Sequence, residues 1–276
     1  MRIAKRDELT GNKATYVRII AILAALVFSG IFLLITGQNP LDVYISMIDG
    51  ALGSGYRLTE TINIAIPLLV ASLGMMMAYK MKFWNIGAEG QIFMGAFGAT
   101  FFALNFNTLP RPLLLILMAI GAMVMGGIWL LIPAYFKGKF GTNETLFTLM
   151  MNYVAIKWVT YLQYSMWKDP NSMGFPRIAN FGENALLPKL FGVHIGWLIA
   201  LVLVAFVNIY MTRTKTGYEL AVIGESENTA RYAGINIKST MFKTMLMGGG
   251  IVGLTGMIQV AGISGTLSVE LTGGMG

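Results

Sequence analysis

The sequence contains no cysteine and only one histidine, His194, among its 276 residues. Disulfide frameworks, thiolate metal sites and cysteine nucleophiles are therefore excluded, and a single histidine cannot form a histidine-based metal cluster alone. Charge is also scarce, because only 12% of the residues are Asp, Glu, Lys or Arg, about half the share found in soluble domains. With 55% hydrophobic residues and a mean hydropathy of +0.66, the chain is predicted to be an integral membrane protein that meets lipid.

Long uncharged stretches recur along the chain, at the length of about 20 residues that a helix needs to cross the hydrocarbon core. Closed membrane barrels show short alternating segments instead. The predicted fold class is therefore all-α, a polytopic transmembrane helical bundle. About seven spans are expected, one of them interrupted only by Lys157: Ile19–Thr36, Thr61–Tyr79, Gly90–Pro110, Pro112–Phe136, Thr145–Trp167, Leu190–Thr212 and Thr244–Val269.

The distribution of basic residues predicts the orientation of these spans, because Lys and Arg concentrate in cytoplasmic segments. Half of them lie in two segments, residues 1–18 and 213–243. We expect residues 1–18 to be a cytoplasmic N-terminal segment before an uncleaved first span. Residues 19–276 form the predicted membrane domain, with 213–243 as a cytoplasmic segment within it. The net charge of +7 then reflects membrane topology, and nucleic acid is not an expected partner.

Two smaller patterns predict local structure. Pro40–Leu52 carries its apolar residues on one helical face, which indicates an amphipathic helix lying at the outer interface. Gly248, Gly249 and Gly250, followed by Gly253 and Gly256, predict close packing of the last span against neighbouring helices.

The segment Phe83–Gln91, FWNIGAEGQ, places polar residues and two glycines between hydrophobic spans. Gly87 and Gly90 would let a helix break there, which is tolerated at membrane depth only inside protein or along a cavity. A glutamate at that depth is a candidate functional residue. Two interpretations stay open: Glu89 belongs to a transport path, or it is a solvated residue of a plain cytoplasmic turn.

Three motifs, in the same order, resemble permease subunits of bacterial ABC importers of the simple sugar and nucleoside type, in the branched-chain amino acid and ribose-type transmembrane family. The stretch FWNIGAEGQIFMGA at 83–96 is similar to the family's F-N-I-G-A-E-G-Q signature, with Trp84 added. The other two matches are GTNETLFTLMMNYVA at 141–155 and TGYELAVIGESENTARYAGI at 216–235. Ribose carriers usually show a different first motif, so the resemblance favours nucleosides over simple sugars.

The resemblance implies an importer subunit in the bacterial cell membrane. Its implied partners are ATPase subunits, a second permease chain, like or unlike this one, and an extracytoplasmic substrate-binding protein. We expect the substrate path to be lined or supported by Asn85, Glu89, Gln91 and Asn152. Relatives usually continue beyond a glycine-rich stretch like 273–276 into spans that mirror the first half. The chain would thus hold part of an inverted repeat, as a truncated chain or an unusually short member.

The third motif also predicts a short helix over Ser226–Ala233, since Ser226 is a good N-cap, Glu227 suits the first turn and Gly234 suits the end. In ABC importers such a coupling helix docks into the ATPase. The residues implied for this contact are Glu225, Ser226, Asn228, Ala230, Arg231 and Gly234. Thr229 and Asn228 depart from the usual alanine and glutamate of that element. A solvated loop helix with no special role is the alternative.

No G-x-x-x-x-G-K-[ST] phosphate loop occurs in the sequence, so the chain is not expected to bind ATP in that manner. It is predicted to be a transport subunit without its own ATPase site, with no cofactor of its own and with ATP bound by a partner. An ion-coupled secondary transporter, using Glu89 or Lys157 as a coupling site, is the alternative function. A membrane enzyme would need a cluster of acids, histidines or cysteines, which this sequence does not offer.

Overall fold

The computed structural model describes residues 12–170 and 172–273 of the chain. It divides into two compact units, residues 1–61 and 62–276, and the division falls within one helix, α3 (Gly55–Lys80). Residues 1–11 of the predicted cytoplasmic N-terminal segment lie outside the described residues.

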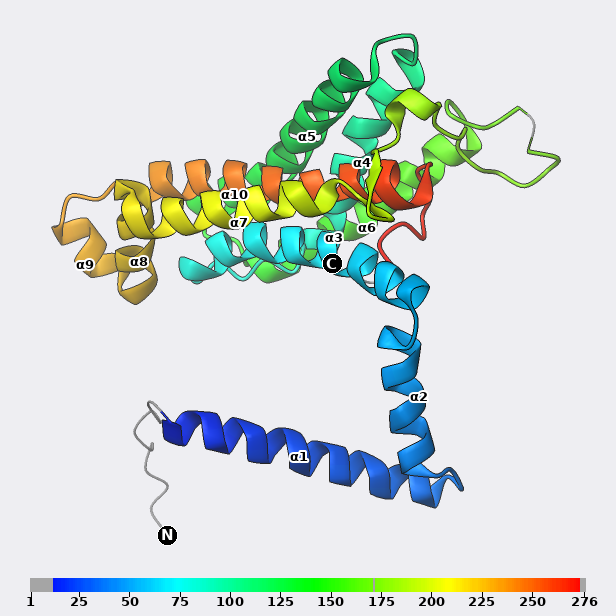
Figure 1. Cartoon of the computed structure of the whole chain (residues 1–276). Helices are drawn as coiled ribbons and strands as arrows, with labels where there is room; N and C mark the ends of the chain where they lie inside the picture. The colour runs from blue at the N-terminus through cyan, green and yellow to red at the C-terminus, as the bar shows by residue number, and fades with distance from the viewer. Residues whose placement is uncertain (1–11, 171, 274–276) are drawn as a thin grey trace. The chain divides into compact units, whose positions relative to one another are not determined.

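The first unit contains α1 (Asn12–Ile35) and α2 (Pro40–Leu52) before the start of α3 (Figure 1). The bounds of α2 are those predicted from its apolar face, and the Asn39 side chain caps it by accepting a hydrogen bond from the Leu41 amide at 3.1 Å. Tyr44 joins the two helices, because its hydroxyl donates to the Leu26 carbonyl at 2.6 Å. Most side chains of α1 are exposed, as expected for a helix surrounded by lipid. The placement of α2 at the outer interface stays a prediction.

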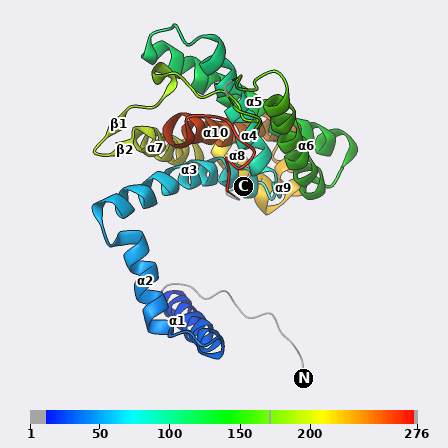
Figure 2. The ribbon, with the colours of Figure 1, turned by 90° about the vertical axis from the view of Figure 1, so that its right-hand side faces the viewer.

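The second unit continues α3 and adds all the remaining elements of the chain. Its helices lie close together around α4, α5 and α10 (Figures 1 and 2). The elements after α3 are α4 (Ala88–Asn105), α5 (Arg111–Phe140), α6 (Glu144–Tyr164), the 3-10 turn η1 (Glu183–Ala185), β1 (Lys189–Leu190), β2 (Val193–His194), α7 (Gly196–Arg213), α8 (Lys215–Glu225), α9 (Glu227–Tyr232), α10 (Ile237–Gln259) and the π-helical turn η2 (Val260–Ser264).

Glycines of α10 let three other helices approach its backbone. A Cβ on Gly126 of α5 would lie 2.5 Å from the Gly249 carbonyl oxygen, and one on Gly74 of α3 would lie 2.5 Å from the Gly248 carbonyl oxygen. A Cβ on Gly95 of α4 would collide with the backbone of Gly253. Small residues allow this close approach between membrane helices. The predicted packing role of the α10 glycines is therefore confirmed.

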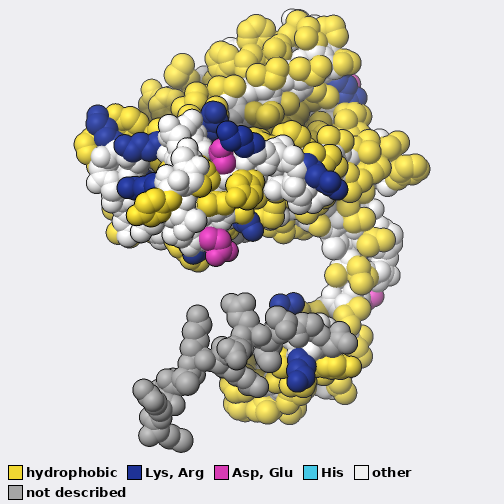
Figure 3. Space-filling view, turned by 90° about the vertical axis from the view of Figure 1, so that its left-hand side faces the viewer, with side chains coloured by type: hydrophobic (Ala, Val, Ile, Leu, Met, Phe, Trp, Pro, Cys, Tyr) yellow, Lys and Arg dark blue, Asp and Glu magenta, His cyan; other side chains and the backbone are white. Residues whose placement is uncertain are grey.

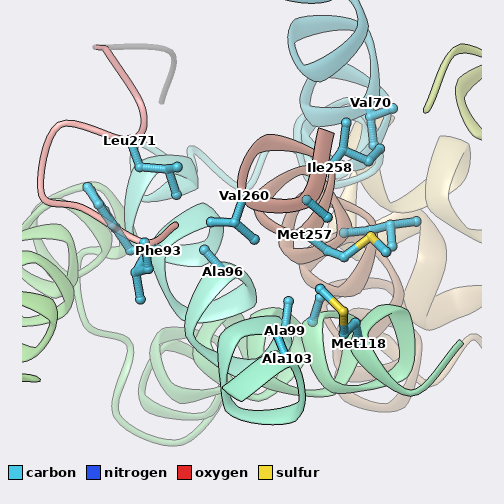
Figure 4. Close-up of a cluster of buried hydrophobic side chains, with 14 of the residues drawn as sticks. Val70, Phe93, Ala96, Ala99, Ala103, Met118, Met257, Ile258, Val260 and Leu271 are labelled. Carbon is cyan, nitrogen blue, oxygen red and sulfur yellow. The ribbon is translucent and has the colours of Figure 1, made fainter. Parts of the chain in front are cut away.

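Apolar side chains fill the space beside these backbone contacts. Figure 4 shows side chains of one buried cluster: Ala96 and Ala99 of α4, Met118 of α5 and Met257 of α10, with Ala99 on the side of Met118 and Phe93 of α4 on the side of Leu271. All of these side chains are buried within the main apolar cluster of the unit. Alanine at this crossing keeps the helices close, while the methionines fill the irregular gaps that remain.

Five helices in the described part of the chain are long and apolar enough to cross a membrane: α1, α3, α5, α7 and α10, the last together with η2. The predicted stretches Gly90–Pro110 and Thr145–Trp167 fold as α4 and α6, which are not among the five. Polar residues such as Glu89 and Gln91 lower the hydropathy of α4, and most of that helix is buried by protein. The count of seven spans and the inverted repeat stay predictions.

One predicted span begins later than expected. Residues 190–195 of the stretch Leu190–Thr212 are not helical, because β1 and β2 pair as a short antiparallel hairpin. Phe191 and Gly192 turn it with φ values of 56° and 83°. The all-α prediction therefore missed two short strands, and α7 starts at Gly196.

Substituting Gly126 by alanine is expected to destabilise the second unit by about 1–3 kcal/mol, because the added methyl has only backbone atoms in its way. Those atoms are the Gly249 oxygen and the Gly253 Cα, each 2.5 Å from the new Cβ. Thermal unfolding of the purified protein in detergent measures the effect. Gly50→Ala in α2 is the matched control, since nothing lies within 4 Å of its added Cβ. Equal unfolding temperatures for the two variants would contradict the packing argument.

Candidate functional site

The connection between α3 and α4 is an irregular stretch, residues 83–87, in which buried and exposed side chains alternate. Phe83, Asn85 and Gly87 are buried, whereas Trp84 and Ile86 are exposed. Its backbone groups cannot form helical hydrogen bonds, so other groups must satisfy them. The neighbouring helix α6 supplies several of these partners.

Thr148 and Asn152 of α6 bind the backbone of this connection at successive turns. The Thr148 hydroxyl accepts a hydrogen bond from the Ile86 amide at 3.1 Å. Asn152 accepts from the Gly90 amide at 2.8 Å and donates to the Ile86 carbonyl at 3.0 Å. Asn152 lies eight residues after the first residue of α6, Glu144, or about 12 Å along the helix. The connection therefore runs alongside α6 for two turns instead of ending at its tip.

The two glycines predicted to break the helix are required by these contacts. A Cβ on Gly87 would lie 2.8 Å from the Cβ of Thr148. A Cβ on Gly90 would lie 2.9 Å from both the Asn152 Oδ1 atom and the Trp129 Nε1 atom. Each glycine thus provides the space through which α6 side chains reach the backbone.

Asn85 and Gln91 form the buried centre of the site, with exposed fractions of 0% and 1%. The Asn85 Oδ1 atom accepts hydrogen bonds from the Gly87 amide at 2.9 Å and from Gln91 Nε2 at 3.2 Å. The Asn85 Nδ2 and Gln91 Oε1 atoms are buried and have no hydrogen-bond partner in the described part of the chain. This pair of side chains therefore keeps one unpaired donor and one unpaired acceptor.

Glu89 faces a different neighbour. It lies in the first turn of α4 and is half-buried, and its carboxylate accepts a hydrogen bond from the Thr272 hydroxyl at 2.7 Å. It is neither fully solvated nor paired with a basic residue within residues 12–170 and 172–273. Asn85 and Gln91 on either side of it are buried, and whether Glu89 belongs to a transport path or to a cytoplasmic turn stays a prediction.

Glu144 connects the same site to α5. It forms an ion pair with Lys137, whose ammonium lies 5.4 Å from the centre of the Phe83 ring. Burial alone would raise the pKa of the Glu144 carboxyl, but the hydrogen bond and positive charge of Lys137 outweigh it and hold the pKa below its ordinary value of 4.5. Glu144 precedes the apolar part of α6, where Asn143 caps the helix by accepting from the Leu146 amide.

The second group of predicted residues lies on α8 and α9, far along the chain from the first. Ser226 caps α9 as predicted, accepting from the Thr229 amide at 3.3 Å, and Gly234 ends it with a φ of 73°. Ala230 is fully buried, whereas Glu225, Asn228 and Arg231 are exposed. The short helix predicted over Ser226–Ala233 is confirmed as α9, Glu227–Tyr232.

The sequence did not predict α8, which precedes α9 and anchors it. Leu220 and Ile223 of α8 are buried in one cluster with Ala230 of α9 and residues of α3, α5 and α10. A Cβ on Gly224 would collide with the Lys80 carbonyl at the end of α3. The sequence also did not identify Thr148 and Thr272 as site residues. Their hydrogen-bond partners, Ile86 and Glu89, are distant in the sequence, and no sequence pattern indicates such a pair.

No group of three or more His, Cys, Asp or Glu residues is placed to hold a metal ion among the described residues. The polar site at α4 and α6 consists mainly of amides and hydroxyls, with Glu89 at its edge. Such groups suit hydrogen bonding to an uncharged polar solute better than metal or redox chemistry.

Comparison with known proteins gives one family and several relatives. Residues 57–274 match the family described as branched-chain amino acid transport system / permease component. The chain is 33% identical to the glucose ABC transporter permease protein TsgB13 of Haloferax volcanii, over 94% of this chain and 71% of that protein. It is 31% identical to the nucleoside ABC transporter permease protein NupB of Lactococcus lactis, over 90% of this chain and 71% of that protein. It is also 27% identical to the guanosine ABC transporter permease protein NupP of Bacillus subtilis, over 89% of this chain and 72% of that protein. No solved structure matches the chain.

Replacing Asn152 by alanine is expected to destabilise the protein by about 1–3 kcal/mol, because one buried backbone group loses its partner and a second, partly exposed one loses a hydrogen bond. Those groups are the Gly90 amide and the Ile86 carbonyl. Thermal unfolding in detergent measures the loss. Asn208→Ala on α7 is the control, since Asn208 is exposed. A loss no larger than that of the control would show that Asn152 does not hold the connection.

Glu144 is expected to make stability depend on pH. Its pKa is lower in the folded chain, so its ionised form stabilises the fold above pH 4.5, and this contribution is lost as the pH falls through the lowered value. Glu144→Gln should be less stable at pH 7 by about 1–3 kcal/mol, and its stability should change less between pH 7 and pH 3. Thermal unfolding across that range tests this, with exposed Glu183→Gln as the control. Identical pH profiles for wild type and Glu144→Gln would refute it.

Proposed function

Because this chain belongs to the family of permease components of the branched-chain amino acid transport system, we propose that it is the membrane-spanning permease subunit of an ATP-driven importer for nucleosides or related small polar solutes such as simple sugars. The family match over residues 57–274 carries this proposal. It covers the connection before α4, α4 itself, α6 and the α8–α9 region, where both groups of predicted site residues lie.

The names of the relatives support the proposed class of cargo. The similar permeases carry glucose, nucleosides or guanosine by name, and all of these are uncharged solutes rich in hydroxyl groups or base edges. The polar site supplies matching groups, since Asn85 Nδ2 is a buried unpaired donor and Gln91 Oε1 a buried unpaired acceptor. Nucleosides are the proposed cargo, with simple sugars as the related class.

Residues around the connection between α3 and α4 have two roles in this proposal. Asn85, Gln91 and Asn152 support the path, because their hydrogen bonds hold the non-helical backbone in place. Glu89 lies along the path, because it is half-buried and its carboxylate binds only a hydroxyl among the described residues.

The α8–α9 region is the proposed contact with the ATPase subunits, which bind the ATP that this chain does not. Exposed Glu225, Asn228 and Arg231 provide the contact surface, while Ser226 and Gly234 cap and end the helix. Figure 3 shows Lys and Arg side chains distributed over the end of the second unit that carries these helices.

This surface contains a groove beside α9. It has a volume of about 550 Å³, and its wall includes Arg231 and Glu227 of α9 and Lys137 of α5. Buried Ala230 ties α9 to Met241 and Met245 of α10 through the shared apolar cluster. A push on α9 would therefore reach α10 directly.

The remaining parts of the proposal follow from the family and the basic residues. The chain pairs with a second permease subunit, receives cargo from an extracytoplasmic substrate-binding protein and is a transport subunit rather than an enzyme. It spans the bacterial cell membrane several times with its N-terminus in the cytoplasm. Residues 1–18 form the cytoplasmic segment, and residues 19–276 form the permease domain with 213–243 as its coupling segment.

An ion-coupled secondary transporter is the alternative. Lys157 offers little support for it, since its side chain is exposed on α6 and can extend toward the membrane surface. Glu89 is the stronger candidate for an ion site, because it lacks a basic partner among the described residues.

Uptake of radiolabelled guanosine, uridine, ribose and glucose tests the proposal in cells that express the complete operon, with and without its ATPase. We expect uptake to fall at least tenfold without the ATPase and to be outcompeted by nucleosides. Arg231→Glu should reduce uptake at least fivefold, because it reverses the charge of the coupling surface. Lys168→Glu is the control, since Lys168 is exposed and lies outside the coupling segment. Uptake that persists without the ATPase but stops when the proton gradient is dissipated would favour the secondary transporter.

A further inference from the structure

The end of α10 meets the beginning of α4 at a second polar cluster. A Cβ on Gly256 would collide with the Ile92 carbonyl and the Ala96 amide, so the last turn of α10 lies directly against α4. Gln259 ends α10 one turn later, and Glu89 lies one turn before Ile92. Gln259 therefore lies beyond this contact along α10 and Glu89 before it along α4, and the consecutive residues Leu271 and Thr272 bridge the two side chains.

Residues 265–273 fold back over α4 and α10 and are bound by both side chains. Leu267, Leu271 and Thr272 are buried, with exposed fractions of 1%, 5% and 2%. Gln259 Nε2 donates to the Leu271 carbonyl at 2.9 Å, and Glu89 accepts from the Thr272 hydroxyl at 2.7 Å. Leu271 and Thr272 are consecutive, so the amide and the carboxylate bind neighbouring points of the same segment.

Hydrogen-bond acceptors remain unused in this cluster. The Gln259 Oε1 atom is buried and has no partner in the part of the chain that the structure describes, and the whole residue is only 8% exposed. A carboxylate can accept about four hydrogen bonds, yet the hydroxyl of Thr272 is the one side-chain donor that Glu89 meets among the described residues. Leaving a buried acceptor unpaired is costly, so this arrangement suits a ligand that brings hydroxyl donors.

We propose that Glu89 and Gln259 form a binding site for neighbouring hydroxyls of a sugar ring, and that Thr272 occupies the place of one such hydroxyl in this structure. The inference rests on the proposed function and names the part of the cargo that is recognised. Glucose and the ribose of a nucleoside share adjacent hydroxyls, which explains how related permeases carry either solute. Each hydroxyl donates to the carboxylate or the amide oxygen, as Thr272 does at 2.7 Å.

Cargo reaches this site when residues 265–273 move away from it. The regular hydrogen bonding of α10 stops at Gln259, where the π-helical turn η2 begins. Gly265 then reverses the chain with a φ of 67°. π-Helical turns occur frequently at functional sites, and a change of direction at Gly265 moves Leu271 and Thr272 together. The segment thus acts as a plug that the cargo replaces.

The test compares uptake of guanosine and 2′,3′-dideoxyguanosine, and of glucose and 2,3-dideoxyglucose, by the whole transporter in liposomes with ATP. Wild type is expected to prefer the hydroxylated cargo at least tenfold. Glu89→Gln and Gln259→Leu should each reduce that preference below threefold. Glu270→Gln is the matched control, because Glu270 is exposed on the same segment and should keep the wild-type preference.

Thr272→Val removes only the competing hydroxyl and leaves both acceptors in place. It should lower the KM for the hydroxylated cargo at least twofold without changing that of the dideoxy analogue. Thr272→Val tests the hydroxyl site even if Glu89→Gln and Gln259→Leu fail to assemble with their partner subunits. An unchanged preference in Glu89→Gln and Gln259→Leu, or an unchanged KM in Thr272→Val, would overturn the inference. ATP-dependent uptake without any preference for hydroxyls refutes this site alone, whereas ATP-independent uptake refutes the proposed function.

Discussion

The close contact of α10 with α3, α4 and α5 is the constraint on which the rest of the second unit depends. Apolar side chains gain little by leaving lipid for protein, so membrane helices associate mainly through close van der Waals packing and interhelical hydrogen bonds. Glycines supply that packing here, since Gly74 and Gly126 each meet the backbone of α10. One helix therefore fixes the positions of three others. A side chain added at this surface would separate several helices at once, and the polar contacts between them would separate too.

The polar site follows from this packing. Because α4 is covered by α5, α6 and α10, it can hold Gln91 inside protein and Glu89 half-buried. For the same reason, the chain can stay non-helical at residues 83–87, where Thr148 and Asn152 replace the missing backbone partners. The helix break thus depends on a neighbour that is already in place. This order of dependence explains why polar and irregular features concentrate around α4, and why exposed α1 carries no charged residue after Arg18.

Local features could be predicted from the sequence, whereas pairings between distant residues could not. Caps and glycine ends depend on residues three or four positions apart, so Ser226 and Gly234 predicted α9. Gly87 and Gly90 predicted a helix break inside protein, and the neighbouring Asn85 and Gln91 are indeed buried. The contacts from Thr148 to Ile86 and from Thr272 to Glu89 join residues 62 and 183 positions apart, and no periodic pattern records such a pair. The hairpin of β1 and β2 was missed because its residues extend an apolar stretch that resembles helix.

The two polar regions of the chain are joined by α10. Its beginning packs with α8 and α9 through Met241 and Met245, and its end holds Gln259 against residues 265–273. A helix of 23 residues spans about 35 Å, so one rigid element connects the proposed ATPase contact with the proposed hydroxyl site. Packed helices commonly respond to ligands by small sliding movements. Glycine contacts suit such sliding, because no side chains interlock across them. A displacement of α9 would then shift Gln259 relative to Glu89, and would loosen the plug at the far end of the same helix.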